Sequence, residues 1–249
     1  MATETYNGII MRILNSAAYI NEKLDIKPIT KTRLSELSPY KYHPKTKDEL
    51  IELVDVHIDM FGDECDLNDI DTSAITDMSS LFSSKCSFNG NISRWNVRNV
   101  KNMSYMFFCA HRFNGDISRW DVSNVIDMSD MFNSADDFNC NISKWDVGSV
   151  QIMRGMFKYT KEFNRNISGW DVHNVTDTHY MFGYSAKFNQ DLSGWNVGNV
   201  INMEGMFYGA RKFKQDLSKW DVRKVAYCAE TFKKSPMEKC PKKQPIFNS

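Results

Sequence analysis

The sequence predicts an α/β solenoid, a stack of units with one short strand and one short helix each, because aromatic and sulfur residues recur at a fixed interval. All six Trp are spaced 25 residues apart, and they are Trp95, Trp120, Trp145, Trp170, Trp195 and Trp220. Thirteen of the 16 Phe and ten of the 14 Met fall into four more columns with this interval. Self-similarity at one period is the mark of a repeat protein. We therefore expect about six to seven stacked units, with the Trp residues in their shared core.

The unit at residues 92–113 shows how each repeat is expected to fold. Residues 92–97 read Ile-x-x-Trp-x-Val, with β-branched and aromatic residues that are typical of a short strand. Residues 100–110 place Val, Met, Met, Phe and Ala at helical spacing. Asn99, with Asn102 three residues later, resembles a capping box and predicts the start of that helix.

Caps are expected at both ends, since the outermost units of a stack would otherwise expose their core. Thr46 and Glu49 form a capping-box pattern that predicts a helix over residues 47–61, and His57 should pack on its apolar face. A further helix is expected over residues 4–23. The predicted organisation is a helix and extended linker or docking arm at 1–45, a helical cap at 46–66, the repeat solenoid at 67–235 and a basic, loosely ordered tail at 236–249.

Composition and motifs argue against several classes of function. Lys plus Arg equals Asp plus Glu at 31 each, which gives no general attraction to nucleic acid. No apolar run is long enough to span a membrane, and no secretory signal is visible, so a cytoplasmic or virion-associated location is expected. None of the six Cys form a CxxC pair, and no catalytic or cofactor-binding motif is present. We therefore predict a protein that is not an enzyme and uses no metal or cofactor.

Two columns beside the expected strand are candidates for binding a macromolecular ligand. Both are basic near the ends of the stack and small in the middle, and we expect them to face solvent on the sheet side. The hypothesis is that they hold an extended partner with acidic or amide groups, and the alternative is a solvated face without a partner. The candidate residues are Arg94, Arg98, Arg119, Lys144, His173, Lys219 and Arg223.

Acidic and aromatic columns allow two other interpretations, which the sequence favours less. Asp or Asn follows every Trp but could bind calcium only if the repulsion between stacked carboxylates were compensated. Asx turns, in which the side chain accepts a backbone N–H two residues later, explain this column better. The Trp and Phe columns could stack on bases or sugars, but their register with the apolar pattern favours core packing.

The repeat resembles a known family. Residues 125–132 read VIDMSDMF and residues 113–122 read FNGDISRWDV, which are similar to the BspA-like repeats of bacterial surface proteins over about residues 67–235. The resemblance implies a leucine-rich-repeat-like fold and a non-enzymatic role in adhesion, scaffolding or protein binding, often at a cell surface. An alternative is a structural component of a larger assembly, such as one encoded by a phage, docked through the N-terminal arm.

Overall fold

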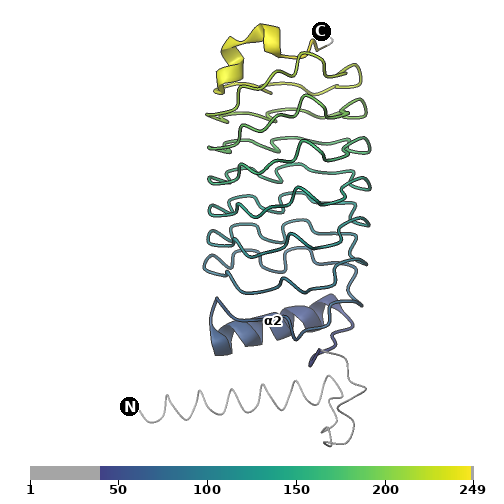
Figure 1. The fold of residues 1–249 in the computed structure, drawn as a ribbon, viewed down its shortest axis with the longest axis vertical. Coiled ribbons are helices and arrows are strands. Elements are labelled where there is room, and N and C mark those ends of the chain that lie inside the picture. Colours follow the sequence, from purple (N-terminus) through teal and green to yellow (C-terminus); the bar gives the residue numbers. More distant parts are fainter. Residues whose placement is uncertain (1–39, 248–249) are drawn as a thin grey trace, which may run out of the picture.

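The computed structural model describes residues 40–247 as a tall stack of similar coils with a helix across its N-terminal end (Figure 1). Isolated parallel bridges join positions 25 residues apart, from Asp77 through Asn102 and onward to Tyr227. The helical elements in the described residues are α2 (Lys47–Phe61) and two 3-10 helices, η2 (Pro236–Lys239) and η3 (Pro241–Lys243). The helix expected over 4–23, and most of the expected linker, lie outside the described residues.

The segment expected to be a helix in each repeat instead forms tight turns that bond to the next coil. Backbone N–H groups of residues 103, 105, 107 and 109 donate to carbonyls at 127, 129, 131 and 133. Intervening N–H groups close turns three residues long, for example from Met106 to Met103. Tyr105 and Cys109 have positive φ, and this left-handed conformation recurs at the equivalent positions of each later coil. A right-handed helix cannot continue through such residues, so the prediction of a helix was wrong here.

The segment expected to be a strand makes no backbone ladder, because its contacts between coils run through side chains. Its own backbone bonds are local turns, such as Trp95 N–H to the Ile92 carbonyl and Val100 N–H to the Val97 carbonyl. The Trp120 indole donates to the Ile92 carbonyl one coil earlier at 3.2 Å, and every Trp repeats this bond over 28 residues. The bridges that repeat along the stack therefore lie in the turn segment, defined as residues 100–111 and their equivalents in the other coils, and only the N-terminal end adds two bridges elsewhere among the described residues, Tyr42–Ile70 and Asp66–Asn91.

The core is a set of aromatic files running along the stack. Phe82, Phe107 and Phe132 are all fully buried, with ring centroids 5.2 and 5.5 Å apart and nearly parallel planes. A second Phe file lies against the first, with Phe107 and Phe113 centroids 3.9 Å apart. All six Trp are no more than 5% exposed. Each coil therefore contributes rings whose faces are covered by the coils before and after it, which makes neighbours necessary for stability.

Helix α2 closes the N-terminal end, and the predicted capping box at its start is formed. The Thr46 hydroxyl accepts the Glu49 N–H at 3.2 Å, while the Glu49 carboxylate accepts the Thr46 N–H. Leu50, Leu53 and Val54 are buried against the first coil. His57 is also buried, and its Nδ1 lies 2.7 Å from the Leu53 carbonyl oxygen, so it packs on the apolar face as expected.

The C-terminal end is closed by a segment that the sequence led us to expect as loosely ordered. Ser235 caps η2 by accepting the Met237 N–H, and the Met237 side chain is fully buried. The Lys243 carbonyl accepts the Leu217 N–H, which ties the end of η3 to the last coil. Pro236 and Pro241 begin η2 and η3, since proline is tolerated at the first helical position.

Candidate interaction surfaces

The Asp and Asn columns are occupied with holding the turns of each coil. Asp121 Oδ1 accepts the Ser123 N–H at 3.2 Å, and Asp116 Oδ1 accepts the Ser118 N–H at 3.0 Å. The same bond recurs at each Asp or Asn that follows a Trp. This confirms the interpretation of these columns as Asx turns. Among residues 40–247, no group of three or more His, Cys, Asp or Glu side chains is arranged to hold a metal ion.

The predicted binding residues are exposed, but they separate into two groups. Arg98, His173 and Arg223 approach carboxylates of the Asx turns beside them. Arg223 Nη2 lies 2.7 Å from Asp221 Oδ2, and hydrogen bonds from this arginine lower the pKa of Asp221 to about 2. The side-chain hydrogen bond from His173 likewise lowers the pKa of Asp171. Arg98 is thus partly neutralised by Asp121 of the next coil, and Arg223 by Asp221 of its own coil.

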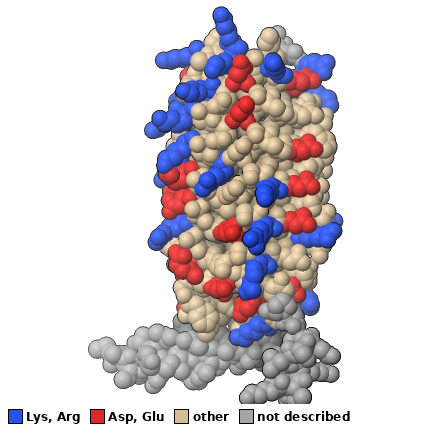
Figure 2. Space-filling view, in the orientation of Figure 1, with Lys and Arg blue, Asp and Glu red and all other residues tan. Residues whose placement is uncertain are grey.

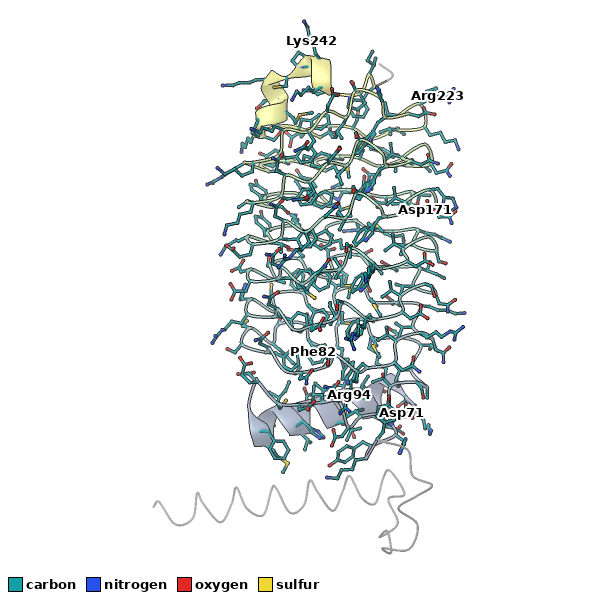
Figure 3. The ribbon with its side chains drawn as sticks, in the orientation of Figure 1. Asp71, Phe82, Arg94, Asp171, Arg223 and Lys242 are labelled. Carbon is teal, nitrogen blue, oxygen red and sulfur yellow. The ribbon has the colours of Figure 1, made fainter. Side chains whose placement is uncertain are left out.

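The remaining candidates form what we call the basic row, and it consists of Arg94, Arg119, Lys144 and Lys219. Within residues 40–247, no carboxylate lies within 4.0 Å of the charged groups of these four residues, although Asp116 and Asp216 respond electrostatically to Arg119 and Lys219. Lys and Arg side chains follow one another along one face of the stack beside a file of acidic side chains (Figure 2). Arg94 lies on this face near α2, while Asp71, Asp171 and Arg223 lie along one edge (Figure 3). The basic row does not lie on a sheet, because the bridges are in the turn segment.

An asparagine ladder, which the sequence interpretation missed, lines a polar groove elsewhere on the stack. Asn114 Oδ1 accepts the Asn139 N–H at 2.8 Å, and this bond repeats in successive coils from Asn89 to Lys214. The groove has a volume of about 470 Å³ and also contains Arg112, Asp137 and Glu162. The signal was visible as Asn after the second Phe column in five successive units. Because its amide oxygens already accept backbone bonds, the ladder serves the coil itself.

Tyrosines gather on the turn segment, where side chains point outward from left-handed residues. All six Tyr between residues 67 and 235 fall in this segment, at Tyr105, Tyr159, Tyr180, Tyr184, Tyr208 and Tyr227. A left-handed side chain leans over the equivalent residue of the next coil. A Cβ on Gly205 would meet the Tyr180 ring at 2.5 Å, and one on Gly209 would meet the Tyr184 ring at 2.8 Å. Glycine follows these tyrosines because the ring occupies the space of a side chain.

Four of these residues form what we call the tyrosine cluster, made of Tyr159, Tyr180, Tyr184 and Tyr208. Tyr159 and Tyr184 stack with centroids 4.6 Å apart and planes inclined by 9°. Tyr208 lies 5.1 Å from Tyr184 and 5.8 Å from Tyr180 between centroids. The cluster therefore joins three neighbouring coils into one aromatic surface, and the sequence interpretation did not identify it.

Two lysines complete the tyrosine cluster. Lys158 Nζ lies 4.7 Å from the Tyr180 ring centroid and 5.5 Å from that of Tyr159. Lys234 Nζ lies 5.0 Å from the Tyr208 centroid. A hydrogen bond between Lys234 and the Tyr208 hydroxyl raises the pKa of the lysine and lowers that of the tyrosine. Lys234 therefore stays charged at neutral pH.

A stack of coils with an aromatic interior, capped ends and side-chain ladders defines a repeat protein. The sequence pattern of one family, described as "Mycoplasma protein of unknown function, DUF285", matches the chain twice, over residues 56–153 and 138–242. The chain belongs to this family. No curated protein and no solved structure matches it. Among the described residues, no helix has the length and apolar character needed to cross a membrane.

Proposed function

We propose that this protein is a non-enzymatic binding or scaffold protein that holds a macromolecular partner on the outside of its coil stack. The observation that carries the proposal is the basic row, which places Arg94, Arg119 and Lys144 on successive coils without a carboxylate within 4.0 Å of their charged groups among the described residues. Cations spaced at about 4.8 Å per coil match an extended chain that carries acidic or amide groups. The partner we favour is a protein.

The fold class and the finer family assignment belong to the same proposal. We infer that the stack is a solenoid related to leucine-rich repeats, and that the repeats are of the BspA-like kind. The phrase VIDMSDMF at residues 125–132 and the 25-residue period support this assignment. An adhesive or surface role follows from that resemblance, and cell fractionation with an antibody against the stack would test it.

Charge reversal along the basic row tests the binding proposal. The variant R94E/R119E/K144E should lose capture of the partner that the wild type recovers, after cross-linking, from the cells that make this protein. The matched control K101E/R211E/K212E changes the net charge equally at exposed positions outside the row. Capture should survive in this control. Equal capture by the wild type and the basic-row variant would contradict the proposal.

A further inference from the structure

Positions that vary between coils point to a second surface, distinct from the basic row. In each coil, the Trp, both Phe columns and the Asx-turn residues are nearly constant, and they fill the core or close turns. The outward positions of the turn segment differ from coil to coil. The left-handed position at Ser80, for example, becomes Tyr105, Asp130, Gly155 and Tyr180 in the next four coils. Residues that hold the coil together must repeat, whereas residues that recognise one partner need not.

The tyrosine cluster has the composition of a binding surface. Tyrosine is enriched in the central contacts of protein interfaces, whereas the rest of this exterior is mostly small or polar. Tyr159 is 43% exposed and Tyr180 and Tyr184 are half-buried, whereas Tyr208 is only 8% exposed and supports the other rings. The rings are also fixed in advance, since Tyr159 stacks on Tyr184 and the Tyr208 hydroxyl bonds to Lys234 and Tyr184. Fixed rings lose little conformational entropy when a partner binds.

Ring orientation narrows the chemistry of that partner. Sugars and bases bind tyrosine by stacking on a free ring face. Here the faces of Tyr159 and Tyr184 cover each other, Lys158 lies over Tyr159 and Tyr180, and Lys234 lies over Tyr208. The cluster therefore presents ring edges, which carry partial positive charge, together with hydroxyl donors and ammonium groups. All of these groups favour an anionic ligand rich in hydrogen-bond acceptors.

The charges around the tyrosine cluster also favour an anionic ligand. No carboxylate lies within 4.0 Å of Lys158 Nζ or Lys234 Nζ among residues 40–247. Glu230 is paired with Lys233, and Asp130 lies 3.9 Å from Arg154, so cations already pair with these two neighbouring carboxylates. Glu230 and then Glu204 are the acidic groups that act on Tyr180. From the coil of Lys158 to that of Lys234 the surface runs for about 14 Å, at about 4.8 Å per coil.

We propose that the tyrosine cluster, with Lys158 and Lys234, docks a short acidic segment of a protein partner in extended conformation. About four or five residues of such a segment span the cluster, at about 3.3 Å per residue. The segment lays its carboxylates on the two ammonium groups and the tyrosine hydroxyls. This inference rests on the proposed binding function but assigns a different surface from the basic row.

A direct titration tests the proposal on the full chain. The probe is a short fluorescein-labelled peptide of Glu, Asp and Gly, compared by fluorescence anisotropy at low salt with a matched peptide of Lys and Gly. We expect the wild type to bind the acidic peptide and not the basic one. K158E/K234E should weaken binding about tenfold, because each reversal removes an attraction and adds a repulsion, each worth a factor of about two to five when exposed. Both positions reach solvent, so the variant should keep the wild-type circular dichroism spectrum and Tm.

The controls separate this surface from the basic row. In the R94E/R119E/K144E background, where the basic row cannot hold the acidic peptide, K158E/K234E should still weaken binding about tenfold. Tyr159→Leu, which keeps an apolar side chain but removes the hydroxyl and the ring edge, should weaken binding in the same direction as the lysine variant. Equal binding by the wild type and K158E/K234E would overturn the inference, and so would the absence of any loss when K158E/K234E is added to R94E/R119E/K144E. Binding of a polyuronate fragment in preference to the peptide would overturn the assignment to a protein segment.

Discussion

Gly205→Ala should destabilise the stack, while Gly194→Ala should not, although both add one methyl group. Gly205 has φ +59°, and an added Cβ would lie 2.5 Å from Cε2 and Cζ of Tyr180. Gly194 has no atom within 4 Å of its Cβ position and no positive φ. The two sites therefore form a matched pair within the repeat.

The magnitude follows from three contributions. A left-handed alanine costs about 1–2 kcal/mol. Overlap with the Tyr180 ring costs about 1–3 kcal/mol, because the ring is held by Lys158 and Tyr208 and has to shift. Loss of glycine entropy in the unfolded chain returns about 0.4–1 kcal/mol at either site. Gly205→Ala should therefore lower the free energy of unfolding by about 1–4 kcal/mol, and Gly194→Ala should raise it by about 0.4–1 kcal/mol.

Urea denaturation followed by circular dichroism measures both variants, with the slope of the transition as a check that the unfolded states are comparable. A double-mutant cycle with Tyr180→Ala isolates the ring. In the Tyr180→Ala background, Gly205→Ala should retain only the left-handed cost, so the coupling should be about 1–3 kcal/mol. Equal stability of Gly205→Ala and Gly194→Ala, or zero coupling to Tyr180, would refute the packing account of this position.

Two other features of the stack give predictions. Trp145→Phe removes the indole bond to the Ile117 carbonyl and two buried ring carbons, so it should cost about 2–3 kcal/mol by urea denaturation. A loss below about 0.5 kcal/mol would show that the indole bond is replaced. For D121N/D171N/D221N, the wild-type side-chain hydrogen bonds lower the pKa of each folded carboxyl, to about 2 for Asp221. Their stabilisation is present above the unfolded pKa of about 3.9 and is lost as the pH falls through the folded values. The Tm of the wild type should thus fall more steeply between about pH 5 and 2 than that of the variant, and parallel curves would contradict this linkage.

Much of the architecture was predictable, because the features that maintain each coil repeat in every unit. The period, the aromatic core, the capping box at Thr46 and the Asx turns all follow from residues that recur or sit at fixed offsets. The asparagine ladder was equally visible as a column after the second Phe, but the sequence interpretation missed it. A residue that repeats on every coil can be recognised in a single sequence, as the Trp, Phe, Asx-turn and ladder residues can.

The segment expected to be a helix forms the backbone bonds between coils, and the segment expected to be a strand does not. Apolar spacing could not predict this. Residues at intervals of three and four fit one face of a helix, but they fit a run of tight turns equally well. The deciding feature is the left-handed conformation at two positions per coil. Glycine marks it in the sequence only at Gly155, Gly205 and Gly209, whereas eleven other residues adopt it without being glycine. The predicted sheet face disappears with the strand, although its basic residues remain exposed.

The left-handed positions also explain why the variable surface lies where it does. At such a residue the side chain leans along the stack onto the next coil, so its size is limited by the residue that follows 25 positions later. Tyr184 has room because Gly209 follows it, and Asp130 has room because Gly155 follows it. A large side chain in one coil is thus followed either by a small one or by a ring that can stack on it, as Tyr184 stacks on Tyr159, which limits the residues that the next coil can carry. Variation between coils therefore follows from the packing at these positions. A surface that differs from coil to coil can distinguish a specific partner from a generic one.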